Sequence, residues 1–289
     1  MLLTSFLFTA AAISAVHGLI FPEVSGVLAG NTDKLKSSIP DYGKIGTRST
    51  PDIARRSGGS GGCPAVWTPI ISELSALFND KSVSPSQCND DARAAIRAAF
   101  HDCGTWDNSQ GETGGCDGSL ITANEAFTRP ENNGLQDTST KLLALQQKYN
   151  KPASPVSVAD LPQVAASVAT LTCPGGPRVS TYVGRKDSSN PAPDDRLPDA
   201  HGSGQSLYEL FLAKGFEAKE LAALLGAHST SKAFHQPDIP AGTPQDDTPG
   251  ILDVHNYSNT LKPVAGMQPF QSDTTSQPIL LSGRSSRVL

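Results

Sequence analysis

Residues 91–103 carry a cation and an imidazole at a spacing that could serve proton-transfer chemistry. The stretch is rich in alanine and has no glycine or proline, which favours a helix with Asn89 or Asp90 as its N-cap. On a helix, Arg97 and His101 lie four positions apart and share a face. They could reach into one cavity from an otherwise small, apolar surface. The alternative is a surface arginine and a hydrogen-bonded core histidine.

A second histidine, His228, ends an apolar stripe on the helix predicted for residues 217–227. A histidine in this position is either a core residue or a ligand to something buried. Asp273 lies downstream, and a metal-bound imidazole typically donates its other N–H to a carboxylate. Asp273 is therefore the candidate partner of His228.

Two oxygen-rich segments accompany these histidines. One set is Asp102, Gly115, Asp117 and Ser119, and the other lies within residues 246–253. Carboxylates, hydroxyls and carbonyls at close spacing are the ligands that Ca²⁺ takes. An acidic turn is often only a solvated turn, but each of these sets adjoins one of the two histidines.

The N-terminal region indicates export. Residues 1–18 have an apolar middle followed by small residues and predict a signal peptide. Residues 19–56 end in Arg55-Arg56 and predict a propeptide cut at this dibasic pair, or else a linker that is never cut. Export would favour disulfides among the five cysteines, which are Cys63, Cys88, Cys103, Cys116 and Cys173. A zinc site from His101, Cys103, Cys116 and Asp117 competes, but export and the lack of a CxxC pair disfavour it.

Composition limits the fold and the partners. The 289 residues have a net charge of −5, which gives no electrostatic reason to expect nucleic acid or an anionic membrane. A content of 37% hydrophobic residues allows a core large enough to enclose a cofactor. No continuous β pattern occurs, so we predict one mainly α domain. Helices are expected over 65–78, 91–103, 138–149, 157–171, 206–214 and 217–227, with loops over 104–118 and 184–199.

Seven short motifs occur in one order along the chain. They are Arg97-x-x-Phe100-His101-Asp102, Gly115-Cys-Asp117-Gly-Ser119, Asn132-x-Gly134-Leu135, Cys173-Pro-Gly-Gly-Pro177, Gly184-Arg185, Ala227-His228-Ser229 and Asp246-x-Thr-Pro-Gly-Ile-x-Asp253. Together they resemble the secreted haem peroxidases of the plant, fungal and bacterial superfamily, and most of all the fungal class II, ligninolytic-type branch. The resemblance covers residues 63–273, and together with a cut after Arg56 it predicts a mature domain over 57–273. It also implies the haem peroxidase fold, in which helices sandwich one haem b.

The resemblance implies a role for each residue of the site. His228 would hold the haem iron with Asp273 on its other N–H, and Phe100 would pack over the haem plane. His101 would move a proton between the two oxygens of hydrogen peroxide, and Arg97 would stabilise the negative charge. Asn132 would accept from the ring N–H of His101, and Glu125 could hold Asn132. Two Ca²⁺ ions would bind, a distal one at Asp102, Gly115, Asp117 and Ser119, and a proximal one at Ser229, Asp246, Thr248, Ile251 and Asp253. The implied disulfides are Cys88–Cys173 and Cys103–Cys116.

Departures from the family pattern narrow the expected substrate. The positions associated with manganese oxidation are Asp90, Ala94 and Phe234, and only one of them is acidic. The position of a substrate-oxidising surface tryptophan is Ala223. We therefore expect a secreted, monomeric, low-potential peroxidase that oxidises phenols or other small aromatic donors in one-electron steps. The alternative is a catalytically impaired haem- and calcium-binding protein of the same fold.

The last segment, residues 274–289, departs from the resemblance. It has no cysteine and no helical period. We expect a divergent tail here, from a short variant or a reading frame that departs near its end. Either would leave Cys63 without its family partner.

Overall fold

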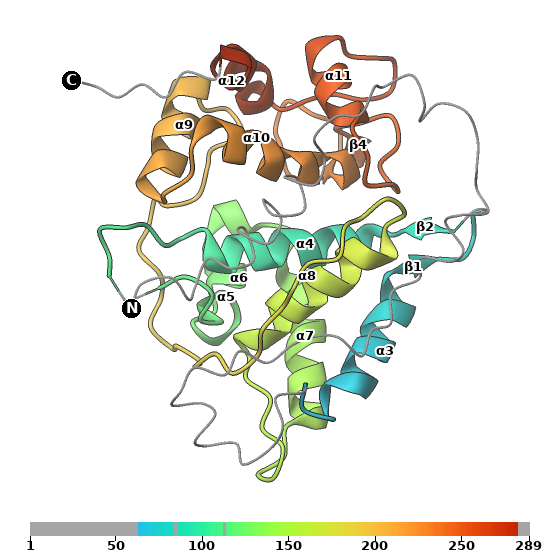
Figure 1. The fold of residues 1–289 in the computed structure, drawn as a ribbon, viewed down its shortest axis with the longest axis vertical. Coiled ribbons are helices and arrows are strands. Elements are labelled where there is room, and N and C mark those ends of the chain that lie inside the picture. Colours follow the sequence, from blue (N-terminus) through green and yellow to red (C-terminus); the bar gives the residue numbers. More distant parts are fainter. Residues whose placement is uncertain (1–62, 84–85, 112–113, 283–289) are drawn as a thin grey trace.

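Helices make up about half of the part of the chain that the computed structural model describes, which is residues 63–83, 86–111 and 114–282, and they are its main regular element. The predicted signal peptide and propeptide lie outside these residues. The described helices form two layers, one above the other in Figure 1. The mainly α fold is confirmed.

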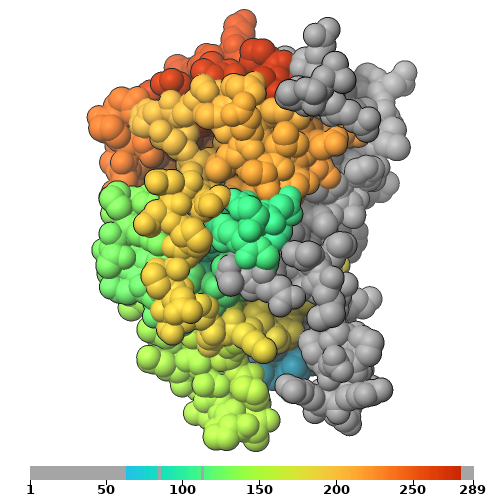
Figure 2. Space-filling model, turned by 90° about the vertical axis from the view of Figure 1, so that its left-hand side faces the viewer, coloured from blue at the N-terminus to red at the C-terminus, as the bar shows by residue number. Residues whose placement is uncertain are grey.

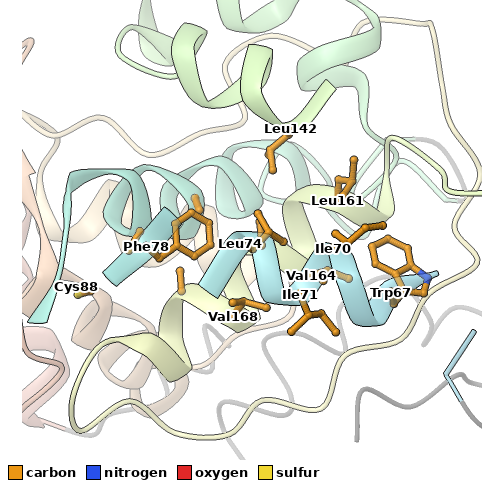
Figure 3. Close-up of a cluster of buried hydrophobic side chains, with 14 of the residues drawn as sticks. Trp67, Ile70, Ile71, Leu74, Phe78, Cys88, Leu142, Leu161, Val164 and Val168 are labelled. Carbon is orange, nitrogen blue, oxygen red and sulfur yellow. The ribbon is translucent and has the colours of Figure 1, made fainter. Parts of the chain in front are cut away.

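The first layer, here called the distal layer, contains the longest helices. Its apolar cluster lies between α3, α4, α7 and α8 (Figure 3). In α3, the side chains of Trp67, Ile70 and Leu74 recur at helical spacing and are all buried. The elements of this layer are α3 (Trp67–Phe78), α4 (Asp90–Cys103), α5 (Ser119–Thr122), α6 (Glu125–Thr128), η3 (Pro130–Asn132), α7 (Gln136–Tyr149) and α8 (Asp160–Thr172).

The second layer, here called the proximal layer, has its own apolar cluster. Leu207, Phe211 and Leu221 are among its buried members. Phe100 of α4 packs against this cluster and stacks on Phe211, with ring centroids 6.2 Å apart, so it joins the two layers. The elements are α9 (Gly204–Ala213), α10 (Ala218–Leu225), η4 (Gly226–Thr230), α11 (His255–Leu261) and α12 (Gln271–Ser282).

Short strands occur only as two antiparallel pairs among the described residues. β1 (Asn79–Asp80) pairs with β2 (Gln87–Cys88), and β3 (Lys232–Ala233) pairs with β4 (Thr243–Pro244). β4 ends at Pro244, shortly before residues 246–253. The longest helices, α4 and α7, have 14 residues each, so no described helix has the length and apolar character of a bilayer span.

The connection from α8 to α9, residues 173–203, links the two layers along one face of the molecule (Figures 1 and 2). It has no regular element, as its prolines led us to expect for 184–199. Near its start, Gly175 has φ +83° and faces the carbonyl of Leu252, which a Cβ would meet at 2.2 Å. The Cys-Pro-Gly-Gly-Pro motif thus allows the end of α8 to approach the 246–253 segment.

The C-terminal segment contains a helix that the sequence pattern does not indicate. Residues 274–282, which have no helical period, belong to α12. Their threonines, serines and Pro278 are poor helix formers, which hid the helix from a propensity argument. Packing outweighs propensity here: Gly204 at the start of α9 lies so close to α12 that a Cβ would be 2.1 Å from the carbonyl of Thr275. Residues 283–289 lie outside the described chain.

Candidate active site

Helix α4 presents two different faces because of its alanines. Asn89 caps it, accepting a hydrogen bond from the Ala92 N–H at 3.1 Å. Ala95 and Ala99 are buried, and their small side chains let α4 pack closely on α8. The same spacing turns Arg97, Phe100 and His101 outward, where each remains partly accessible. The sequence prediction of a shared Arg97–His101 face is thus matched by the structure.

His101 is held by a chain of hydrogen bonds on its Nδ1 side. Its Nδ1–H donates to Asn132 Oδ1 at 2.7 Å, and Asn132 Nδ2 donates to the backbone carbonyl of Glu125 at 3.1 Å. The Glu125 carboxylate instead accepts from the Ala192 N–H at 2.6 Å and faces Arg129. Glu125 therefore holds Asn132 through its main chain, and its carboxylate anchors the 173–203 connection.

Arg97 places its positive charge directly beside His101. Its Nε–H donates to His101 Nε2 at 3.2 Å, while Nη1 and Nη2 donate to the carbonyls of Asn133 and Glu131, each at 2.7 Å. Burial lowers the pKa of Arg97 to about 10, so the side chain stays charged at neutral pH. Because the Nδ1–H of His101 donates to Asn132, Nε2 is the basic nitrogen of this imidazole.

The pKa of His101 is far below that of a free imidazole. Burial is the main cause and the charge of Arg97 adds to it, while the bond to Asn132 opposes them, which brings the pKa to about 3. His101 is therefore neutral across the physiological pH range. A neutral imidazole can accept a proton at Nε2 once the hydrogen bond from Arg97 is displaced.

His228 lies on η4 in the opposite layer, with Asp273 of α12 behind it. Its Nδ1 is 3.0 Å from both carboxylate oxygens of Asp273. Burial acts to lower the pKa of His228, but the Asp273 carboxylate outweighs burial and the pKa is raised. Because Nδ1–H donates to Asp273, Nε2 carries the lone pair on the side away from the carboxylate. The sequence reasoning missed Gln245, whose Nε2 donates to Asp273 Oδ2 at 3.2 Å.

The position of His228 depends on α11. The hydroxyl of Tyr257 donates to the Ala222 carbonyl at 2.8 Å, and Asn256 Nδ2 donates to the Leu225 carbonyl at 3.4 Å. These bonds satisfy carbonyls at the end of α10, immediately before η4. No regular pattern in the sequence pointed to this short helix.

The faces that the two layers turn toward each other fit a flat, largely apolar group such as haem. The side chain of His228 is 28% exposed, and Leu224, Leu225 and Phe100 are only partly buried. His101 on α4 and His228 on η4 each have a basic Nε2, and Phe100, Leu224 and Leu225 pack against the proximal apolar cluster. The donor set suits an iron held from the proximal layer, with the other layer left for a small reactant.

The residues predicted to bind the distal calcium lie around the end of α4. Asp102 is buried, and its carboxylate accepts from the N–H groups of Gly118 at 3.1 Å and Leu120 at 3.3 Å. Burial, with Asp117 nearby, raises the pKa of Asp102 well above its usual range. The hydroxyl of Ser119 is buried and has no hydrogen-bond partner among the described residues. Clustered carboxylates and an unpaired buried oxygen fit a cation.

The residues predicted to bind the proximal calcium also combine buried carboxylates with unpaired oxygens. Asp246 is completely buried, and burial with Asp253 and Asp247 nearby raises its pKa. Asp246 Oδ2 and the hydroxyl of Ser229 have no hydrogen-bond partner within the described parts of the chain. Thr248 Oγ1 donates to Asp253 Oδ2 at 2.8 Å, and the carbonyl of Thr248 accepts from Ile251. The structure thus brings Asp246, Thr248, Ile251 and Asp253 into one loop.

The cysteines form the two disulfides that the family resemblance implied. Cys88 is bonded to Cys173 and Cys103 to Cys116, while Cys63 is a free thiol. The zinc alternative is therefore wrong, because Cys103 and Cys116 have no thiolate to offer. Across the described residues, no cluster of three or more His, Cys, Asp and Glu side chains suits a metal. The candidate calcium sets depend on hydroxyl and carbonyl oxygens instead.

Comparisons with known proteins agree with this geometry. The family model described as "Peroxidase" matches residues 70–276. "Manganese peroxidase 3" of Phlebia radiata is 32% identical over 192 residues, which is 64% of this chain and 51% of that protein. "Peroxidase" of Arthromyces ramosus is 30% identical over 75% of this chain and 62% of its own length. "Low-redox potential peroxidase" of Taiwanofungus camphoratus is 34% identical over 71% and 58%. This chain thus spans between about half and three fifths of these relatives, and it belongs to the peroxidase family.

Proposed function

We propose that this protein is a secreted, monomeric haem peroxidase that uses hydrogen peroxide to oxidise phenols or other small aromatic donors in one-electron steps. The observation that carries the proposal is the pairing across two layers of His101, neutral and oriented by Asn132, with His228, held by Asp273. The two disulfides support an oxidising compartment. Haem b, when bound, would supply the two electrons that cleave the peroxide O–O bond.

The hydrogen-bonding atoms of His101, Arg97 and Asn132 suggest the role of each residue in the distal layer. His101 Nε2 would take a proton from one peroxide oxygen and return it to the other, which leaves as water. Arg97 would stabilise the negative charge that develops on the leaving oxygen. Because the Nε–H of Arg97 already donates to His101 Nε2, peroxide must displace this bond when it enters. Asn132 would keep the Nδ1 proton in place, so that Nε2 remains the base.

We further propose that the enzyme has a low redox potential and does not oxidise Mn²⁺. Asp90 is the one acidic residue at the three positions associated with manganese, and its Oδ1 is 2.6 Å from Arg93 Nη2 and 3.4 Å from Lys232 Nζ. Two cations already neutralise it, which leaves little attraction for Mn²⁺. Both tryptophans, Trp67 and Trp106, are buried, so neither offers a surface site for electron transfer.

The test is expression with hemin and Ca²⁺. A Soret band that shifts when peroxide is added, together with oxidation of a phenolic dye, is the expected result. Manganese(II) should add nothing to the rate. A Soret band that does not change when peroxide is added would indicate a protein that binds haem but does not turn over. Failure to bind haem at all would overturn the proposal.

We expect the reaction with peroxide to be nearly independent of pH over most of the acid range. His101 works as a base only when neutral, and its pKa of about 3 keeps it neutral until the solution is strongly acidic. The second-order rate constant, measured by stopped flow with brief pH jumps, should therefore fall only as the pH approaches that value. A fall centred near pH 6.5, the pKa of an ordinary imidazole, would contradict this environment for His101.

Removal of calcium should lower activity. Asp102 lies beside His101 and Ser229 beside His228, so loss of both cations would loosen both histidines and leave buried carboxylates unneutralised. Prolonged treatment with EGTA should reduce turnover and weaken the Soret band, and added Ca²⁺, but not Mg²⁺, should restore both. Unchanged activity and absorption after complete chelation would rule out this role.

A further inference from the structure

Gln245 is a completely buried primary amide directly before Asp246. Burial of an amide is unfavourable unless its donors and acceptor find partners. Its Oε1 accepts from the hydroxyl of Ser231, and its Nε2 donates to Asp273 Oδ2 at 3.2 Å. Its backbone N–H donates to the Ser231 carbonyl at 3.1 Å. Side chain and main chain together fix one orientation.

The orientation of this amide is determined by the chemistry of its neighbours. A carboxylate only accepts hydrogen bonds, so the NH₂ end of Gln245 must face Asp273. The β3–β4 register, with Lys232 opposite Pro244, places Ser231 opposite Gln245, where its hydroxyl binds the other end of the amide. Asp273 therefore receives hydrogen bonds from two neutral donors, Gln245 and the Nδ1–H of His228.

We infer that Gln245 is a positioning residue that limits how strongly Asp273 draws the Nδ1 proton from His228. The inference rests on the proposed haem-binding role of His228. A hydrogen bond to the charged form of a carboxylate stabilises that form and makes it a weaker base. With the Gln245 bond in place, His228 keeps more of the character of a neutral imidazole. It then donates less electron density to the bound iron, which raises the reduction potential of the iron.

The same bond connects two parts of the site. Gln245 is covalently joined to Asp246 of the proximal calcium set, and Ser231 lies three residues after His228. Movement of the 246–253 loop would therefore shift Gln245 and alter its hydrogen bond to Asp273. The electronic state of His228 is thus tied to the order of this loop.

The decisive variant is Gln245→Met in the haem-loaded, calcium-loaded protein. Methionine has a similar volume and no donor, so Asp273 should draw the His228 proton more strongly. The Fe(III)/Fe(II) reduction potential should become more negative, and the iron–histidine stretching frequency in resonance Raman spectra of the ferrous form should rise. Ser231→Ala removes only the anchor of Oε1 and should shift both quantities in the same direction by less.

Gln163→Met is the matched control. Gln163 is also completely buried, but it donates to the Ala99 carbonyl at 3.3 Å in the distal layer. Its replacement should change thermal stability and leave the potential and the iron–histidine frequency unaltered. If Gln245→Met does not fold, the shift in Ser231→Ala decides the question.

Two different failures can be told apart. If the parent protein binds no haem, the proposed function fails first. If the parent binds haem and reacts with peroxide, but Gln245→Met and Ser231→Ala keep its potential and frequency, the role of Gln245 is refuted and the proposed function stands. A shift of equal size in Gln163→Met would also refute it.

Discussion

Replacing His101 with alanine is expected to slow the reaction with hydrogen peroxide by about 100- to 10,000-fold, the usual contribution of a positioned proton-transfer group. The variant lacks the nitrogen that would take the peroxide proton. Arg97 should keep its bonds to the carbonyls of Asn133 and Glu131 and still provide positive charge. The measurement is the stopped-flow rate constant for the Soret change after peroxide is added.

Haem binding should survive this change, because His228 lies on the opposite layer and is held by Asp273. His201→Ala is a matched control: His201 is a surface histidine that pairs with Gln236 and Asp238. It should react at the parent rate. If the His101→Ala protein binds haem and reacts with peroxide as fast as the control, His101 does not carry out the proton transfer.

Asn132 provides a second check on the same assignment. Its carbonyl holds the His101 Nδ1–H, so Asn132→Ala should slow the reaction less than His101→Ala does. In the His101→Ala background, the loss of Asn132 should have no further effect on the rate, because it acts through the missing ring. Additive effects would mean that Asn132 has a separate role.

Removal of the Cys88–Cys173 disulfide should destabilise the protein by about 4 kcal/mol, since the bond closes a long loop in the unfolded chain. The two cysteines are 85 residues apart in sequence and both are buried. The Cys88→Ser/Cys173→Ser protein should melt on the order of 10 °C lower. Thermal denaturation followed by circular dichroism measures this loss.

The location of this disulfide adds a functional consequence. The Cys88 N–H donates to the Gly250 carbonyl at 3.2 Å, and Leu252 N–H donates to the Pro174 carbonyl at 2.8 Å. The disulfide joins the segment before α4 to the end of α8, and these hydrogen bonds attach both to the 246–253 loop. Cys63→Ser is the control, because Cys63 is a free thiol. A double variant as stable as this control would show that the loop is held by other contacts.

Local rules explain which parts of the site the sequence could predict. The spacing of Arg97 and His101 on an alanine-rich helix fixes their shared face before any tertiary contact forms. The His228–Asp273 and Asn132–His101 pairs are separated by 45 and 31 residues. The first was expected because a metal-bound imidazole needs a carboxylate partner, whereas only the family resemblance connected the second in advance. Periodicity carries no information about contacts at such distances along the chain.

Other features depend on contacts that a sequence pattern does not express. Glu125 was expected near Asn132, but the contact is made by its backbone carbonyl, which every residue type has. Gln245 stands alone in a polar loop, where nothing distinguishes a buried glutamine from a solvated one. Helix α12 forms from poor helix formers because it packs against α9, so propensity did not indicate it.

The separate apolar clusters of the two layers bear on how reactants reach the site. Each layer gains stability from its own cluster, and Phe100 stacked on Phe211 is a bridge between them. A small separation of the layers would break the Phe100–Phe211 contact and further expose Arg97, His101 and His228, which are already partly accessible, while most contacts within each cluster would remain. Such an opening is a sub-global fluctuation, which needs far less free energy than unfolding. Separate clusters in the two layers would thus allow the site to open further to solvent while the protein stays folded.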